Sequence, residues 1–227
     1  MSSGRAAISW SAGKDSMLAL LRAREAGLVV DTFLTMCEAD GTSKSHALPP
    51  DLVSAQVAAL GGTWMPVRVP PAASPVYAAS FDAALSTLHA QGHTQIVFGD
   101  IDLQAHRDWL EPACERAGLQ AVFPLWGQPR LALAQEVVRR GIGARLVCVD
   151  SRWLDDGFVG AEYDNALLAR LPRGVCPCGE GGEFHTFVWH GPGFAAPLAL
   201  QPGEVRRLAS TPPMSPTHFI LKTPGLS

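Results

Sequence analysis

Short apolar runs alternate with segments of helical periodicity along the first half of the chain. The runs predict strands at Arg5–Trp10, Val29–Met36, Trp64–Val69, Gln95–Phe98 and Gln120–Phe123. Between them, apolar residues recur at helical spacing in Asp15–Ala26, Asp51–Leu60, Pro75–Ala90 and Ala105–Ala117, and a glycine follows each segment as a stop signal. This alternation predicts four consecutive βα units and therefore a parallel sheet with crossover helices.

Beyond residue 123 the pattern is less regular. We expect a helix at Leu131–Arg140 and strands at Arg145–Asp150, Phe184–His190 and His218–Lys222. The regular half predicts a doubly wound α/β domain with a five-stranded parallel sheet over residues 1–123. The less regular half predicts a smaller C-terminal α+β domain over residues 124–227.

Composition and charge narrow the class of protein. Of the 227 residues, 47% are hydrophobic and 17% are charged, which is typical of a globular protein. The net charge of −3 disfavours a nucleic acid partner, and no apolar run approaches the length of a membrane span. Fifteen Arg against three Lys indicate a GC-rich genome and hence a bacterium.

The cysteines point to a reducing compartment. Their number, five, is odd and their spacing is not that of a secreted disulfide framework, so we expect a cytoplasmic protein. Cys176 and Cys178 form CxC rather than CxxC, and no second pair stands at zinc-site spacing, which disfavours structural zinc. No pattern marks an exposed thiol of low pKa for sulfur transfer.

The sharpest chemical feature is the segment Ser11–Ser16, SAGKDS, which directly follows the first predicted strand. A loop that begins a helix directs backbone N–H groups and the positive helix end toward one point, which favours a phosphate. Lys14 adds a positive charge. The GxxxxGKS loop of common NTPases is excluded because its leading glycine is missing and Asp15 follows the lysine. A plain helix cap by Ser11 or Asp15 is the alternative.

Two further segments combine glycines with carboxylates. Gly99 and Asp100 follow the fourth predicted strand, and the ends of strands one and four can meet in one crevice of such a sheet. Asp100 would there hold Mg²⁺ or a substrate amine, or alternatively cap the next helix. Residues 176–187 read CPCGEGGEFHTF, in which Glu180 and Glu183 are candidates for accepting a proton or binding an amine or metal. A hairpin turn would use the same glycines.

Together these segments resemble a known family. SAGKDS, then GDIDLQAHRDWLEPACERAGL from Gly99, PLW at 124–126 and CGEGGEFHTFV from Cys178 are similar in order and spacing to the diphthine-ammonia ligases. This family belongs to the pyrophosphate-loop ATPases of the adenine nucleotide α-hydrolase superfamily. The resemblance extends to about Phe194. It implies an adenine nucleotide α-hydrolase-like α/β domain that binds ATP and a C-terminal domain that binds the substrate.

The resemblance assigns residues to roles. It implies ATP binding by Ser9, Ser11, Ala12, Gly13, Lys14, Asp15, Ser16, Met36, His46, Gly99 and Asp100. It implies substrate binding by Gly179, Glu180, Gly181, Gly182, Glu183, His185 and Thr186. Catalytic roles would fall to Lys14, Asp15, Asp100, Glu180 and Glu183, and Mg²⁺ would be held by Asp15 and Asp100. Two departures stand out: Ala12 replaces a family glycine, and His185 replaces the glutamate of the eukaryotic and archaeal ligases.

The implied reaction is ATP-dependent amide formation. A substrate carboxylate attacks the α-phosphorus of ATP with the help of Mg²⁺, pyrophosphate leaves, and ammonia or an amine then displaces AMP. Diphthine belongs to the elongation factor of eukaryotes and archaea, so a bacterial member would amidate another small carboxylate, as in cobalamin salvage. A homodimer is compatible with the family.

Two other classes of function stay open at the level of sequence. A non-catalytic ATP or AMP sensor would share the fold but would not need the glutamate-rich segment around Glu180. A tRNA-modifying adenylase would need a basic surface, which the net charge of −3 disfavours.

Overall fold

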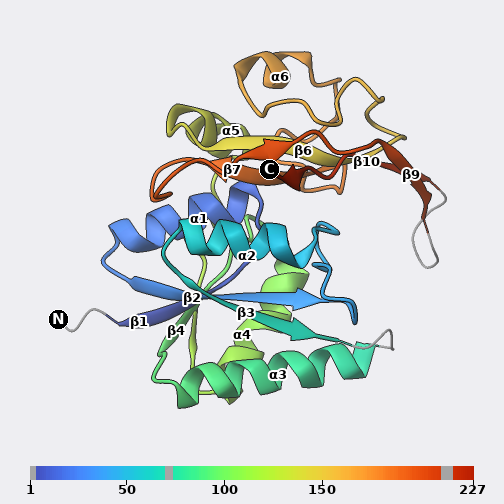
Figure 1. The fold of residues 1–227 in the computed structure, drawn as a ribbon. Helices are drawn as coiled ribbons and strands as arrows, with labels where there is room; N and C mark the ends of the chain where they lie inside the picture. The colour runs from blue at the N-terminus through green and yellow to red at the C-terminus, as the bar shows by residue number, and fades with distance from the viewer. Residues whose placement is uncertain (1–3, 70–73, 211–216) are drawn as a thin grey trace.

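Five parallel strands form the first sheet, in the order β3-β2-β1-β4-β5. The computed structural model describes residues 4–69, 74–210 and 217–227. The strands are β1 (Arg5–Ser9), β2 (Val29–Cys37), β3 (Thr63–Arg68), β4 (Gln95–Val97) and β5 (Gln120–Val122). The helices between them are α1 (Lys14–Glu25), α2 (Pro50–Ala59), α3 (Ser74–Ala90) and α4 (Gln104–Arg116). In Figure 1, α1 and α2 cover one face of the sheet, and α3 and α4 cover the other.

The strand order places β1 beside β4, as the sequence predicted. Ala6–Ile8 of β1 pair in parallel with Gln95–Val97 of β4 and, on the other side, β1 pairs with β2. Ala6, Ala7 and Ile8 are fully buried because helices cover both faces of the sheet. The winding reverses between β1 and β4, and in such sheets ligands bind at the carboxyl ends of the strands at this point.

An antiparallel sheet, β7-β6-β10-β9, forms a further layer over α1 and α2 (Figure 1). This part of the chain contains α5 (Arg130–Arg139), β6 (Gly143–Asp150), α6 (Asn165–Arg170), β7 (Phe184–His190), β9 (Arg206–Ala209) and β10 (His218–Leu221). Two short strands, β8 (Leu200–Gln201) and β11 (Gly225–Leu226), pair with each other. No helix among the described residues is long and apolar enough to cross a membrane.

The fold class predicted from the sequence is confirmed, and every predicted element is present within one or two residues of its expected bounds. The elements that the sequence did not predict are α6, β8, β9 and β11, which are two to six residues long. Periodicity needs a longer window than that to be recognised.

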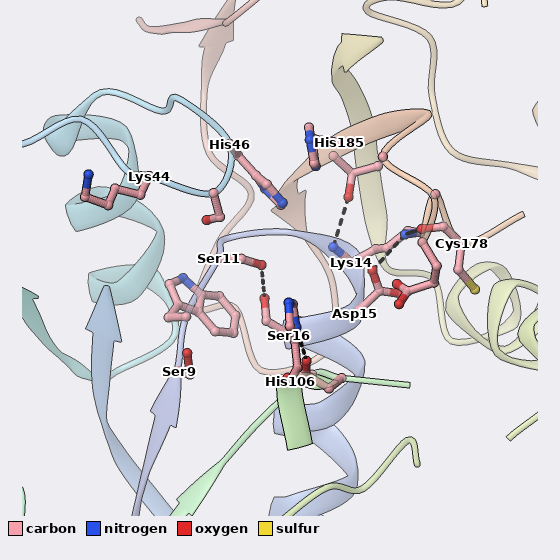
Figure 2. Close-up of a pocket in the computed structure, with 18 of the residues that line it drawn as sticks. Ser9, Ser11, Lys14, Asp15, Ser16, Lys44, His46, His106, Cys178 and His185 are labelled. Carbon is pink, nitrogen blue, oxygen red and sulfur yellow. Dashed lines mark hydrogen bonds and ion pairs between the residues drawn. The ribbon is translucent and has the colours of Figure 1, made fainter. Parts of the chain in front are cut away.

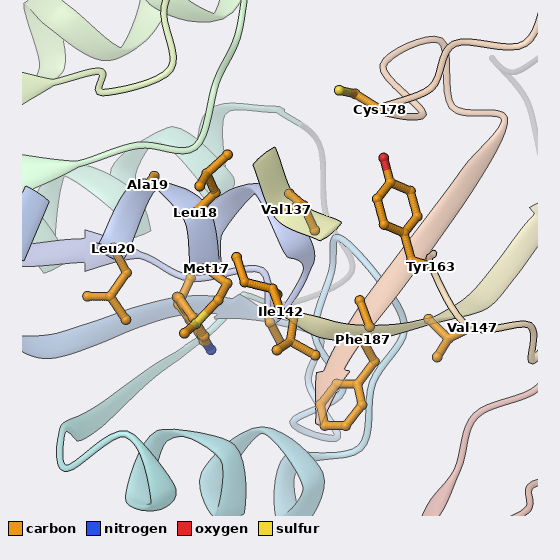
Figure 3. Close-up of a cluster of buried hydrophobic side chains, with 14 of the residues drawn as sticks. Met17, Leu18, Ala19, Leu20, Val137, Ile142, Val147, Tyr163, Cys178 and Phe187 are labelled. Carbon is orange, nitrogen blue, oxygen red and sulfur yellow. The ribbon is translucent and has the colours of Figure 1, made fainter. Parts of the chain in front are cut away.

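The hydrophobic core joins the two sheets through α1. Met17 and Leu20 of this helix are fully buried in the same cluster as Ile142 and Phe187 of the C-terminal half (Figure 3). A second cluster, around Phe81 and other residues of α3 and α4, fills the opposite face of the parallel sheet. This packing fixes the first turn of α1, which is part of the loop Ser11–Ser16, close to the segment that leads into β7.

Candidate functional site

A cavity of about 540 Å³ opens at the carboxyl ends of β1, β2 and β4, opposite the segment that precedes β7. It is lined by most of the residues predicted to bind ATP or substrate: Ser9, Ser11, Lys14, Asp15, Ser16, Met36, His46, Gly99, Asp100, Gly179, Glu180, Gly182, His185 and Thr186. Ala12, Gly13, Gly181 and Glu183 are not among the residues that line the cavity. Residues more than 160 positions apart in the sequence therefore meet around one space (Figure 2).

The loop Ser11–Ser16 leaves backbone donors free at the start of α1. Gly13 is the N-cap residue and makes no side-chain cap. The Ser11 hydroxyl accepts the Gly13 amide at 3.3 Å, so Ser11 satisfies one amide of the loop, as the capping alternative proposed. The hydroxyl of Ser16 donates to the Gly13 carbonyl at 2.9 Å. Within the described residues, the amides of Asp15 and Ser16 have no hydrogen-bond acceptor, while that of Lys14 donates to Thr186 Oγ1 at 3.1 Å.

Two glycines allow the chain to approach closely around this loop. A Cβ atom on Gly99, at the end of β4, would lie 3.0 Å from the Ser16 amide nitrogen. A Cβ atom on Gly13 would lie 2.6 Å from Cε1 of His46. The end of β4, the first turn of α1 and the His46 ring therefore pack too tightly for any larger residue at these positions.

Ala12 adopts a left-handed conformation, with φ of +66°. Its carbonyl accepts hydrogen bonds from the Val188 amide and from Nε2 of Gln56, both at 3.0 Å. Left-handed backbone is costly for residues with a Cβ atom. Glycine would therefore be favoured at position 12, where this chain has alanine instead of the family glycine. The contacts with α2 and β7 hold Ala12 in its left-handed conformation.

Lys14 is charged but buried. Its ammonium group donates to Asp15 Oδ2 at 2.8 Å and to the carbonyl of Cys178, and it lies 5.3–5.4 Å from the ring centroids of Phe184 and Tyr163. Burial lowers the pKa of Lys14 and is the largest single influence on it, but the charge and hydrogen bond of Asp15 together with the nearby Cys178 and Glu180 outweigh burial, and the pKa is raised. The ammonium therefore remains a fixed positive charge beside the cavity, and its predicted contact with phosphate stays a prediction.

Two histidines face each other above the loop. The ring centroids of His46 and His185 are 4.8 Å apart. Burial lowers the pKa of both, to about 4 for His185, so both rings are neutral at pH 7. In the described part of the chain, Nδ1 of His46 and Oδ1 of Asp15 are buried atoms without a hydrogen-bond partner. Buried polar atoms are rarely left unpaired, so these two atoms are candidates for binding a ligand.

The two glutamates of the CGEGGE segment are placed differently. Glu180 lines the cavity, and burial together with the nearby Asp15 charge raises its pKa to about 7. Glu183 is 5% exposed, and its two carboxylate oxygens accept the amides of Cys176 at 2.9 Å and of Gly181 at 2.8 Å. Glu183 thus fixes the turn that presents Glu180.

Asp100 does not cap α4. The N-cap residue is Leu103, and Oδ1 of Asp100 lies 2.9 Å from Nδ1 of His106. Among the described residues, no cluster of three or more metal-binding side chains is present. The candidate Mg²⁺ ligands Asp15 and Asp100 both line the cavity, and the unpartnered Oδ1 of Asp15 suits a cation bound together with phosphate oxygens.

Sequence reasoning missed Gln56, which is fully buried behind the loop. Its Oε1 atom accepts from the Trp10 indole at 2.8 Å, and its Nε2 atom donates to Val188 O at 2.5 Å as well as to Ala12 O. Gln56 therefore connects α2, the phosphate-loop candidate and β7. An amide side chain among the apolar positions of α2 was the available signal.

A parallel α/β sheet with such a loop at its switch point defines a nucleotide-binding protein of the adenine nucleotide α-hydrolase type. Two family models match the chain: the diphthamide synthase N-terminal domain over residues 4–121 and the diphthamide synthase C-terminal domain over residues 129–209. The chain belongs to the diphthamide synthase family that these domains define.

Curated relatives agree with this assignment. The chain is 34% identical over 101 residues to the diphthine–ammonia ligase of Bos taurus, a match that covers 42% of this chain and 38% of the relative. It is 33% identical over 101 residues to that of Homo sapiens, with the same coverage, and 31% identical over 122 residues to that of Danio rerio, covering 52% and 47%. The matches span less than half the length of these relatives.

Proposed function

We propose that this protein is an ATP-dependent amide ligase that adenylates a carboxylate, releases pyrophosphate and transfers ammonia or an amine to the acyl group. The observation that carries the proposal is the loop Ser11–Ser16, whose free amides and unpartnered Asp15 Oδ1 face a cavity that the CGEGGE segment closes from the other side. The names of the relatives, diphthine–ammonia ligase, support the same reaction class.

ATP would lie along the loop. Its phosphates would accept from the amides of Asp15 and Ser16, from the hydroxyl of Ser11 and from the ammonium of Lys14. The adenine ring would lie toward Met36, at the end of β2. Bound Mg²⁺, held by Asp15 and Asp100, would neutralise charge that develops on the phosphates.

The acceptor would lie toward the C-terminal half, against Gly179–Gly182, His185 and Thr186. Because its pKa is close to 7, Glu180 is suited to take the proton that the attacking amine loses. Glu183 then acts as a positioning residue, because both of its oxygens are used within the turn. Residues 1–123 form the ATP-binding domain and residues 124–227 the substrate-binding domain in this proposal.

The acceptor is a small or protein-borne carboxylate, and ammonia is the simplest nitrogen donor. The neutral imidazoles of His46 and His185 form its wall. The proposed reaction needs ATP and free ammonium, and the cytoplasm supplies both.

Product identification by phosphorus NMR tests this proposal. The protein is supplied with MgATP, ammonium and a panel of carboxylic acids. We expect AMP and pyrophosphate with one class of acid. At a fixed concentration of free ammonia, the rate should rise as the pH passes about 7, because Glu180 must be ionised to accept a proton. Glu180→Gln should remove that rise. Formation of ADP and phosphate would contradict the proposal, and tight nucleotide binding without turnover would favour a sensor.

A further inference from the structure

The segment Cys176–Cys178 is hydrogen-bonded to two side chains, Lys14 and Tyr163. The carbonyl of Cys178 accepts a hydrogen bond from the Lys14 ammonium, and the carbonyl of Pro177 accepts one from the Tyr163 hydroxyl at 2.6 Å. Figure 3 shows the Tyr163 hydroxyl directed toward the segment that carries Cys178. Any movement of this short stretch of backbone therefore changes the surroundings of the ammonium group beside the cavity.

The sulfur atoms of Cys176 and Cys178 both contact Arg130. Nη1 of Arg130 lies 3.5 Å from Sγ of Cys176, and Sγ of Cys178 lies 3.1 Å from the Arg130 carbonyl. The guanidinium group is fixed by two hydrogen bonds of 2.7 Å to the carboxylate of Asp102. The arrangement places a fixed positive charge beside Cys176, and Cys178, two positions along the chain, has its own sulfur against the same arginine.

Cys176 is set apart from the other cysteines by its acidity. Hydrogen bonds from the Cys178 thiol and from the backbone of Glu180 and Cys178, and last the charge of Arg130, lower the pKa of Cys176 despite its burial. Burial instead raises the pKa of Cys114 and of Cys148 to about 12. The thiolate is the nucleophilic form of cysteine, so Cys176 is the thiol expected to react with an electrophile.

We propose that Cys176 and Cys178 form a redox modification site, in which a small peroxide converts the pair into an intramolecular disulfide. The Cys176 thiolate attacks one oxygen of hydrogen peroxide, hydroxide leaves, and Cys176 becomes a sulfenic acid. The Cys178 thiol then attacks that sulfur, water leaves, and the S–S bond forms. Two thiols are oxidised by two electrons and one peroxide is reduced to two waters.

Oxidation at this site acts on the cavity. Closing the bond brings the two sulfur atoms to about 2 Å, which replaces the thiolate beside Arg130 and shifts the backbone around Cys178, whose carbonyl accepts from the Lys14 ammonium. Because Cys176 is 8% and Cys178 3% exposed, a small oxidant such as hydrogen peroxide is the reagent suited to this site. The effect on ATP rests on the proposed function, whereas the disulfide itself does not.

Peptide mass mapping of the full-length protein tests the modification. Reduced protein is treated with hydrogen peroxide, remaining thiols are blocked, and the peptide that contains both cysteines is analysed. We expect it to lose two hydrogens and to recover them with dithiothreitol. Cys114→Ala should oxidise in the same way, and Cys176→Ser should not. A wild-type peptide that keeps both thiols, or oxidation confined to other cysteines, would overturn the proposal.

Calorimetric titration with MgATP tests the coupling in the same samples. The disulfide form of the wild type should bind at least about tenfold more weakly than the reduced form, the factor that accompanies the loss of one hydrogen bond to a charged group. The Cys176→Ser variant should bind equally before and after peroxide. Equal MgATP binding by the reduced and the disulfide forms of the wild type would overturn the coupling. A reduced wild type that binds no ATP would refute the proposed function, and the peptide mapping alone would then decide whether the disulfide forms. If Cys176→Ser does not fold, the rate at which iodoacetamide modifies each cysteine of the wild type replaces this control. Cys176 should react first, and a Cys176 that reacts no faster than the other cysteines would overturn the proposal.

Discussion

At the scale of single residues, the site has glycine at two crowded positions but alanine at a position whose backbone conformation favours glycine. Gly13 and Gly99 are glycines because neighbouring atoms leave no room for a side chain. Ala12 instead carries a Cβ atom at a φ of +66°, and its buried methyl group packs in the core. The strain at Ala12 and the packing of its methyl group therefore oppose each other.

Ala12→Gly should leave the free energy of unfolding nearly unchanged. Relief of about 1–2 kcal/mol of left-handed strain offsets the loss of one buried methyl group, at about 0.8 kcal/mol, and the greater freedom of glycine in the unfolded chain, at about 0.5–1 kcal/mol. Ala19→Gly, equally buried but inside α1, is the matched control and should cost about 2 kcal/mol. Urea denaturation measures both, and equal costs would show that Ala12 is not strained.

At the scale of elements, the site depends on contacts between segments whose pairing no local pattern predicts. The loop after β1 was predictable because its residue types and its place after a strand both point to phosphate. The side chain of Gln56 on α2 was not, because spacing along a helix does not show which distant carbonyl an amide reaches. The same holds for Glu183, whose spacing matches Glu180 but whose oxygens turn inward.

Gln56→Leu should destabilise the protein by about 2–4 kcal/mol. The substitution leaves the buried Trp10 indole N–H and the Val188 carbonyl without their partner, and each unsatisfied group costs about 1–3 kcal/mol. Gln120→Leu, which removes an exposed hydrogen bond to Gln95, should cost less than about 0.5 kcal/mol. Chemical denaturation compares the two variants. A Gln56→Leu variant as stable as Gln120→Leu would show that Gln56 does not join α2, the loop and β7.

At the scale of the whole molecule, the two halves of the chain build one site. The fold class of the regular first half, and the meeting of its first and fourth strands, were predictable because each βα unit repeats a strong pattern. How the C-terminal sheet packs on α1 was not, because its strands are short, its connections are long and its partners lie far away in sequence. The family assignment fits this architecture, and the cavity lined by residues of both halves is where we propose that the reaction takes place.

The measurement that tests the account most directly is a calorimetric titration of MgATP into the reduced wild type and into Gly13→Val. The valine side chain would occupy the space under His46, where even a Cβ atom would be 2.6 Å from the ring. The account predicts that the wild type binds MgATP, that Gly13→Val binds at least about tenfold more weakly, and that Gly225→Ala, in open space far along the chain, binds like the wild type. A wild type that does not bind ATP, or a folded Gly13→Val variant that binds it equally well, would contradict the claim that this loop is the ATP site.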